Sequence, residues 1–459
     1  MALQRTLTVT ALVALAGAAA APHGRAVTYS DLLAPLGSAA PPAAAAPSAL
    51  YTKYTFDAAQ WPMARCLDGG PGAVYVRPSL TPAGATRFKI FFQGGGWCTS
   101  HEDCYARSKT DLGSTAGLPA TAVDPAGYCG ASFLSQDASV NSATADFTSI
   151  YVPYCDGTSS TGAALAPAYV NASAAVTYRG AYLRDALVGT LAAAHGLRAA
   201  TEVLLGGCSA GGLTIYLNVD YLAGLVRAVA PSASVRALAD AGWFLDHLNG
   251  AGQPFRTPLF EWGFAAWNSS AALAPACLTA YPGEEWKCIF AQYTARFIAT
   301  PTFLLNSRYD TCQLNVRRGA APPFPSSASP SLRASPPRAP RTRRWQGCEL
   351  GLPDANKPWP QMAASSRAAA VAYASDFDAA LAASGFASAP QHGGWVSSCL
   401  VHCDAGDGAW SHTLAQPRSG SGPALTPSAA FEAWRAGGAG AGDGWWSDRS
   451  ATPNMTATC

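Results

Sequence analysis

Short apolar segments recur along this chain and alternate with longer segments of helical pattern. The short segments are apolar and β-prone, which is typical of buried strands. The expected strands are residues 72–77, 88–93, 148–153, 202–206, 234–239, 300–306 and 393–398. The expected helices are residues 176–197, 210–227 and 363–384. Strands that alternate with long helices predict an α/β fold, with a mainly parallel central sheet flanked by helices on both faces.

The clearest candidate for chemistry lies where the strand at 202–206 meets the next helix. Residues 207–211 read Gly-Cys-Ser-Ala-Gly and fit the pattern G-x-S-x-G, in which a serine occupies a sharp strand-to-helix turn. Small residues must flank the serine because the turn forces strained backbone angles. The pattern predicts that Ser209 is a nucleophile near the positive end of the following helix. The alternative interpretation is a glycine-rich turn without chemistry.

A second segment supplies what a nucleophilic serine needs. The strand at 88–93 runs directly into Gly94-Gly95-Gly96-Trp97-Cys98. Acyl transfer needs backbone N–H donors aimed at the developing oxyanion, and a glycine-rich loop after an early strand provides them in this fold class. We expect these donors to be Gly96, Trp97 and Ala210. Three glycines can also serve simply to let two backbones pack closely.

An acid and a histidine are expected to follow the serine in chain order. Asp310 comes just after the strand at 300–306, where an acid that orients the imidazole should lie. Three histidines follow it, namely His392, His402 and His412. His402 lies in a segment where Cys399 and Cys403 could clamp a short loop, although spacing alone does not separate it from a solvated or core histidine.

These segments together resemble the pectin acetylesterase/Notum family of secreted serine carboxylesterases. The matching segments run in order from about residue 60 to residue 459. They are Cys66–Gly69, Gly94–Cys98, Tyr154–Gly157, Gly207–Leu213, Leu238–Asp246, Tyr309–Leu314, Ser398–Cys403 and Cys459. The resemblance implies an α/β-hydrolase-like domain with Ser209 as nucleophile, Asp310 as acid and His402 as base. It also implies oxyanion donors at Gly96, Trp97 and Ala210, and the mechanism requires no metal and no organic cofactor.

The resemblance is divided between two branches of that family. The strand-to-helix turn at Cys208–Leu213, which we call the elbow, resembles the plant pectin acetylesterases. Residues 155–157 and 399–403 resemble them as well, which implies hydrolysis of acetyl esters of cell-wall polysaccharide. Residues 217–220 and 284–288 resemble the Notum branch, which removes palmitoleate from a signalling protein. The alternatives are therefore removal of a longer fatty acyl group from protein, or a non-catalytic cell-wall protein with the same fold. The aromatic-rich region 243–299 permits a lid or substrate wall, or equally an ordinary core.

Two positions depart from the plant pattern. Plant members carry a His-Cys pair where Asn218 and Val219 occur here, which puts one plant-type disulfide in doubt. Cys312 replaces an aromatic residue often found two positions after the acid. This substitution either opens the pocket or creates a new disulfide.

Composition limits the binding partners that we expect and indicates where the folded domain begins. Charged residues are 13% of the chain and the net charge is +2, which favours neither nucleic-acid nor membrane-surface binding. Residues 1–21 are typical of a signal peptide and their apolar run is too short for a stable membrane span, although a retained anchor is the alternative. Residues 22–49 are expected to form a disordered Ala/Pro-rich leader, and residues 50–459 one esterase domain with a disordered Pro/Ser/Arg-rich insert at 317–345. We expect a secreted monomer, extracellular or in the cell wall.

The cysteine count favours disulfides over metal sites in a secreted chain. Thirteen cysteines leave at least one unpaired, and Cys208 in the elbow is our candidate for that thiol. Two further hypotheses make Cys208 itself the nucleophile, or make Cys399, Cys403 and His402 zinc ligands. Glycosylation sequons occur at Asn171, Asn268 and Asn454.

Overall fold

The computed structural model describes residues 49–126, 131–142, 144–249, 252–314, 359–406, 409–418, 422–437, 444–448, 450 and 452–453. The predicted signal peptide, the predicted insert and almost all of the predicted leader lie outside these residues, as do Asn454 and Cys459.

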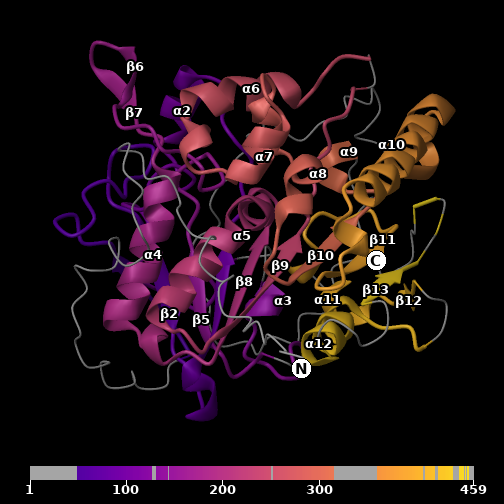
Figure 1. Ribbon diagram of the computed structural model, residues 1–459, viewed down its shortest axis with the longest axis horizontal. Coiled ribbons are helices and arrows are strands. Elements are labelled where there is room, and N and C mark those ends of the chain that lie inside the picture. Colours follow the sequence, from indigo (N-terminus) through magenta and orange to yellow (C-terminus); the bar gives the residue numbers. More distant parts are fainter. Residues whose placement is uncertain are drawn as a thin grey trace, which may run out of the picture.

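The described residues form one eleven-stranded sheet with helices packed around it (Figure 1). The strands of this sheet are β1 Tyr51–Thr55, β2 Ala73–Arg77, β3 Arg87–Phe92, β4 Thr121–Ala122, β5 Thr148–Val152, β8 Glu202–Cys208, β9 Ser234–Asp240, β10 Thr302–Ser307, β11 Gly393–Ser397, β12 Gln416–Pro417 and β13 Trp445–Ser447. A separate two-stranded hairpin, β6 Ala168–Asn171 and β7 Ala174–Val176, projects from the body at the upper left of Figure 1.

The sheet is parallel in its centre and antiparallel at its edges. Its order is β12-β13-β11-β10-β9-β8-β3-β5-β2-β1-β4. Every neighbouring pair from β5 through β3, β8, β9, β10 and β11 to β13 is parallel. The pairs β2–β5, β1–β2, β1–β4 and β12–β13 are antiparallel. The predicted mainly parallel sheet is therefore confirmed.

Helices cover both faces of the sheet. They are α2 His101–Arg107, α3 Ala131–Leu134, α4 Gly180–Ala194, α5 Ala210–Val229, α6 Thr257–Ala266, α7 Pro275–Ala280, α8 Ala291–Thr294, α9 Thr311–Leu314, α10 Ala364–Ala383, α11 Ala409–His412 and α12 Pro427–Gly437. In β8, Val203 and Leu205 belong to the core that α4, α5 and α10 cover, whereas Leu204 and Cys208 belong to the core that α3, α11 and α12 cover. This alternation is the two-residue period of a strand buried on both sides.

Near-continuous apolar runs explain why the central strands form where they do. All six residues of β10 are buried, as is every residue of β8 after the first. Burying one large aliphatic side chain contributes about 1.5–3 kcal/mol, so such a run is strongly favoured in the middle of the sheet. Lys89 in β3 is a buried charged residue within this sheet: it is 0% exposed and donates from Nζ to the carbonyl oxygens of Phe133 and Ser135, each at 3.0 Å. Burial lowers the pKa of Lys89 well below its usual range.

Disulfides join several pairs of the described cysteines, and two of these pairs are far apart in the sequence. The pairs are Cys66–Cys155, Cys98–Cys104, Cys208–Cys403 and Cys277–Cys288. Cys312 and Cys399 are disulfide-bonded as well. Among the described helices, none combines the length and the apolar character that crossing a membrane would require.

Burial of His392 gives the fold a predictable response to acid. Its ring stacks on Phe386 with centroids 4.1 Å apart, and its Nδ1 accepts the N–H of Thr302 at 3.2 Å while Nε2 faces the carbonyl of Ile298 at 3.2 Å. Burial lowers the pKa of His392 from 6.5 to about 4. The folded-state pKa is below the unfolded value, so the stability that the neutral ring contributes is fully present above about pH 6.5 and is lost as the pH falls towards 4.

We therefore expect His392→Gln to reduce the loss of unfolding free energy between pH 7 and pH 4 by up to about 3 kcal/mol, since one pKa unit corresponds to 1.36 kcal/mol. Urea unfolding at both pH values measures this difference. The variant His412→Gln, at an exposed histidine of α11, is the control and should retain the wild-type pH dependence. An unchanged loss in His392→Gln would contradict the prediction.

Candidate active site

The turn between β8 and α5 holds Ser209 in a strained conformation. Ser209 has φ 60° and ψ −124°, a region that non-glycine residues rarely adopt. Its N–H donates to the carbonyl oxygen of Asp240 at 2.9 Å, and its carbonyl accepts the N–H of Leu213 at 2.9 Å. Such strain costs about 1–3 kcal/mol and persists only where the surrounding structure enforces it, most often at functional sites.

Steric contact explains the glycines on either side of the serine. A Cβ atom at Gly207 would overlap the carbonyl of Gly211, and one at Gly211 would overlap the carbonyl of Phe92. A Cβ atom at Gly212 would overlap the carbonyl of Asp240. The G-x-S-x-G-G spacing is thus required by the close approach of α5 to β3 and β9.

The glycine-rich loop that follows β3 packs directly against this turn. A Cβ atom on Gly94 would lie 2.5 Å from the carbonyl oxygen of Cys208 and 2.7 Å from Cβ of Ser209. Gly96 has φ 62°, which favours glycine, and the carbonyl of Gly95 accepts from Nη2 of Arg107 at 2.8 Å. The structure therefore brings the predicted oxyanion loop next to Ser209.

A buried serine that the sequence did not indicate joins this loop to the start of α5. Trp97 donates from Nε1 to Oγ of Ser159 at 2.9 Å, and that hydroxyl donates to the carbonyl of Ala210 at 2.8 Å. Ser159 has φ 49° and its carbonyl accepts from Nδ2 of Asn218 at 3.1 Å. Asn218 therefore takes part in the hydrogen bonding of this turn.

The carboxylate of Asp156 stabilises the turn that contains Ser159. Its Oδ2 accepts the N–H groups of Thr158 and Ser160, each at 3.0 Å. Burial raises the pKa of Asp156, and the hydrogen bonds from Thr158 and Ser160 oppose that rise. A local signal for this turn existed in the Cys-Asp-Gly segment, but nothing in the sequence indicated that the turn reaches the elbow.

Three backbone amides, two in the glycine-rich loop and one at the start of α5, are the expected oxyanion donors. In the described part of the chain, the N–H groups of Gly96 and Trp97 donate to no other residue. Ala210 is the first residue of α5, a position whose N–H has no intrahelical acceptor. All three residues are buried. Buried unpaired donors are uncommon and suit an anionic ligand atom.

Asp310 and His402 meet at the carboxyl end of the sheet. Nδ1 of His402 lies 2.9 Å from Oδ1 and 2.8 Å from Oδ2 of Asp310, whose side chain is 0% exposed. Oδ1 also accepts the N–H groups of Cys312 and Gln313 at 2.8 and 3.0 Å, where α9 begins. A carboxylate only accepts, so Nδ1 of His402 carries the proton and a neutral ring presents a lone pair on Nε2.

The other two candidate histidines lie elsewhere. His392 is buried beside Thr302 and Ile298 at the opposite end of β10, and His412 is exposed and within hydrogen-bonding distance of Ser411. Of the three, His402 is the histidine in contact with Asp310.

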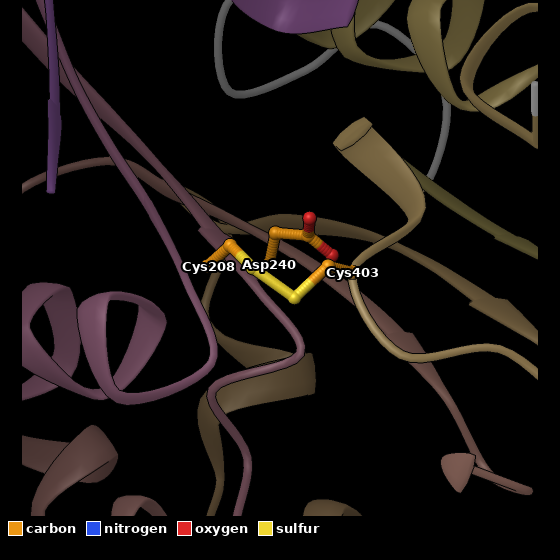
Figure 2. A group of neighbouring side chains, drawn as sticks. All are labelled: Cys208, Asp240 and Cys403. Carbon is orange, nitrogen blue, oxygen red and sulfur yellow. A yellow bond between two sulfur atoms is a disulfide. The ribbon is translucent and has the colours of Figure 1, made fainter. Parts of the chain in front are cut away.

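The cysteines correct several of our expectations. Cys208 is bonded to Cys403, with Cα atoms 5.7 Å apart, so it is not the unpaired thiol (Figure 2). The bonded sulfur of Cys208 is not a nucleophilic thiolate, and Cys399 and Cys403 do not clamp a loop by pairing with each other. The zinc hypothesis is wrong for the same reason, because both of its cysteines are in disulfides. Cys312 has formed a disulfide, as one of its two alternatives required.

Aromatic side chains from the region 243–299 pack behind the histidine and the glycine loop. The ring of Phe244 lies 4.9 Å from that of Trp97 and 6.4 Å from that of His402, and Phe260 lies 5.0 Å from Trp97. Both phenylalanines are 0% exposed, so this part of the region is core. The guanidinium of Arg256 lies 4.6 Å from the Phe244 ring, and burial lowers its pKa to about 10, which leaves it charged at neutral pH.

Comparison with known proteins agrees with this geometry. A family model described as pectinacetylesterase matches residues 45–437. Pectin acetylesterase 7 of Arabidopsis thaliana is 29% identical over 349 residues, which cover 75% of this chain and 78% of that protein. The human palmitoleoyl-protein carboxylesterase NOTUM is 30% identical over 267 residues, which cover 55% of this chain and 50% of that protein. The structure of the Wnt deacylase Notum from Drosophila superposes with a TM-score of 0.66 at 18% identity, covering 89% of this chain and 99% of that one, and shows the shared fold.

Proposed function

The chain belongs to the pectinacetylesterase family, whose named members are carboxylic ester hydrolases, and on that premise we propose that it hydrolyses acetyl esters of cell-wall polysaccharide through Ser209, His402 and Asp310. The observation that carries this proposal is the hydrogen-bonded pair of Asp310 and His402, attached through Cys403 to the strained turn of Ser209.

In the first half of the proposed reaction, Oγ of Ser209 attacks the ester carbonyl carbon while Nε2 of His402 takes the hydroxyl proton. The carbonyl oxygen becomes negative and accepts hydrogen bonds from the amides of Gly96, Trp97 and Ala210. Each such donor contributes about 3 kcal/mol to transition-state stabilisation in comparable enzymes. The intermediate collapses, the C–O bond to the sugar breaks, and the leaving alkoxide takes the proton from His402.

The second half repeats these steps with water. His402 removes a proton from water as its oxygen attacks the acyl-serine, and the same amides stabilise the new oxyanion. The C–O bond to Ser209 breaks, Oγ regains the proton from His402, and the carboxylic acid leaves. Asp310 holds Nδ1–H of His402 throughout and stabilises the imidazolium. No step in this scheme calls for a metal or an organic cofactor.

Acetyl is the favoured acyl group because the pectin acetylesterase relative aligns over more of this chain than NOTUM does, 75% against 55%. Buried core residues such as Phe244 and Phe260 occupy the space behind the histidine. The alternative is a longer acyl group on protein, which the similarity to NOTUM favours.

A substrate panel tests the proposal. We expect kcat/KM for 4-nitrophenyl acetate to exceed that for the octanoate at least about tenfold, since each extra methylene must find space in the pocket. Release of acetate from acetylated pectin and acetylated xylan, compared with deacylation of a lipidated peptide, then identifies the natural ester. Faster octanoate turnover together with peptide deacylation would support the alternative. No turnover of any ester and no labelling of Ser209 by a fluorophosphonate would support a non-catalytic protein.

We also propose that the protein is secreted and glycosylated. The disulfides require an oxidising compartment. Asn171 and Asn268, in two of the sequons, are exposed and accessible to a glycosyltransferase.

A further inference from the structure

Three residues outside the proposed triad connect the nucleophile turn to the loop that carries His402. Cys208 directly precedes Ser209, and Cys403 directly follows His402. The third residue, Asp240, ends β9 and is the register partner of Cys208 on β8. The two sulfur atoms and a carboxylate oxygen of Asp240 all lie within 4.8 Å of one another (Figure 2).

Asp240 binds both parts of the site at once. Its backbone carbonyl accepts the N–H of Ser209 at 2.9 Å. Its carboxylate accepts from the other part, with Oδ1 3.0 Å from the N–H of Asp404 and Oδ2 2.9 Å from the N–H of Ala405. Asp240 is 0% exposed, so water does not compete for these hydrogen bonds. One residue thus holds the nucleophile turn by its main chain and the His402 loop by its side chain.

The disulfide forms a parallel, covalent connection between the same two parts. It lies on the face of β8 opposite α5, where Cys208 and Cys403 both belong to the core that α3, α11 and α12 cover. Cys403 has φ 73°, an unfavourable value for a residue with a side chain. On the other side of His402, the carbonyl of Val401 accepts the N–H of Thr311 at 3.2 Å. His402 is therefore fixed through both of its sequence neighbours.

Proton transfer makes the position of this loop important. A base must lie within about 2.6–3.2 Å of the atom that gives up the proton, and a displacement of 1 Å can cost about 100-fold in rate. Between β11 and α11, the described residues form no helix or strand apart from the 3-10 turn Asp404–Gly406 and a single bridge residue, Cys399, so the position of this segment depends on its connections.

We propose that Asp240 and the Cys208–Cys403 disulfide are positioning groups that set the distance between the His402 imidazole and Oγ of Ser209. This inference rests on the proposed function, in which His402 is the base. Neither group touches the ester, so both act through the placement of His402 and Ser209.

Removal of the disulfide is the first test. In Cys208→Ser/Cys403→Ser, kcat for 4-nitrophenyl acetate should fall about 10- to 100-fold while KM stays within about twofold, because binding of the ester does not need the base. The matched control is Cys277→Ser/Cys288→Ser, which removes another fully buried disulfide, between α7 and the 3-10 turn Glu285–Ile289. Both variants should melt at a lower temperature than the wild-type protein. At temperatures below its own melting transition, however, the control should keep kcat within about twofold of the wild-type value.

Asp240→Asn is an independent test that leaves every disulfide in place. Its amide retains one acceptor oxygen and turns an N–H₂ group towards a backbone N–H, so one hydrogen bond to the His402 loop is lost. We expect the same loss of kcat at nearly constant KM. When this change is added to the cysteine double variant, the combined loss of kcat should differ from the product of the two separate losses, because both groups hold one loop.

The outcomes are distinct. Retention of kcat within twofold by both variants overturns the inference, as does an equal kcat loss in the Cys277/Cys288 control. If neither variant folds, non-reducing peptide mapping of the wild-type protein decides, since a Cys208–Cys403 peptide supports the inference and any other pairing of Cys208 overturns it. Ser209→Ala is assayed alongside. If it stays active the proposed function fails, whereas an inactive Ser209→Ala beside active positioning variants removes this inference alone.

Discussion

Replacement of Ser209 by alanine is expected to lower kcat for 4-nitrophenyl acetate by at least about 10⁴-fold. The change removes the only atom that attacks the carbonyl, and the residual rate should come from the amide donors and from binding alone. Stability should hardly change, because alanine keeps the Cβ atom and the two backbone hydrogen bonds of the turn. Initial rates on purified protein and a thermal melt measure the two effects.

The control for this variant is Ser375→Ala on the exposed face of α10, where the hydroxyl donates to the carbonyl of Val371. It should keep full activity. Fluorophosphonate labelling should be lost in Ser209→Ala and retained in Ser375→Ala. Turnover in Ser209→Ala above about 1% of wild type, with contaminating esterase excluded, would remove Ser209 from the mechanism.

The sequence predicted the core of the fold because the relevant signals are local. The strands expected at 88–93 and 202–206 are β3 and β8, since unbroken apolar runs have few alternatives to a buried position. The helix expected at 210–227 is α5, which begins within the glycine-rich elbow. The antiparallel strand β1, which lies between β2 and β4, was missed because its five residues alternate little and its partners lie at residues 73–76 and 121–122.

The site shows where local reasoning ends. The turns at Ser209 and at Gly96 could be predicted because the spacing of the glycines indicates each of them. Cys208 was misjudged as unpaired, since nothing in the sequence relates it to a cysteine 195 residues away. The role of Asp240 depends on contacts between β9 and the His402 loop, and that of Ser159 on a contact between the turn after β5 and the start of α5. Such contacts exist only once the sheet has assembled.

The acid offers the second large effect. In Asp310→Asn we expect kcat at pH 7 to fall about 10⁴-fold, or about 5 kcal/mol in activation free energy, with little change in KM. Oδ1 of Asp310 accepts the N–H groups of Cys312 and Gln313, so the carbonyl oxygen of an asparagine would remain on those two donors. Its N–H₂ group would then face Nδ1 of His402 and donate to it.

That reversal fixes the wrong tautomer of His402. With Nδ1 accepting, the proton resides on Nε2, and this nitrogen can no longer take the proton of Ser209. Asp220→Asn is the matched control, because Asp220 also accepts two backbone N–H groups, from Ala299 at 2.9 Å and Thr300 at 2.7 Å, but on the exposed surface. It should keep kcat, whereas an Asp310→Asn enzyme within tenfold of wild type would show that this carboxylate does not orient the base.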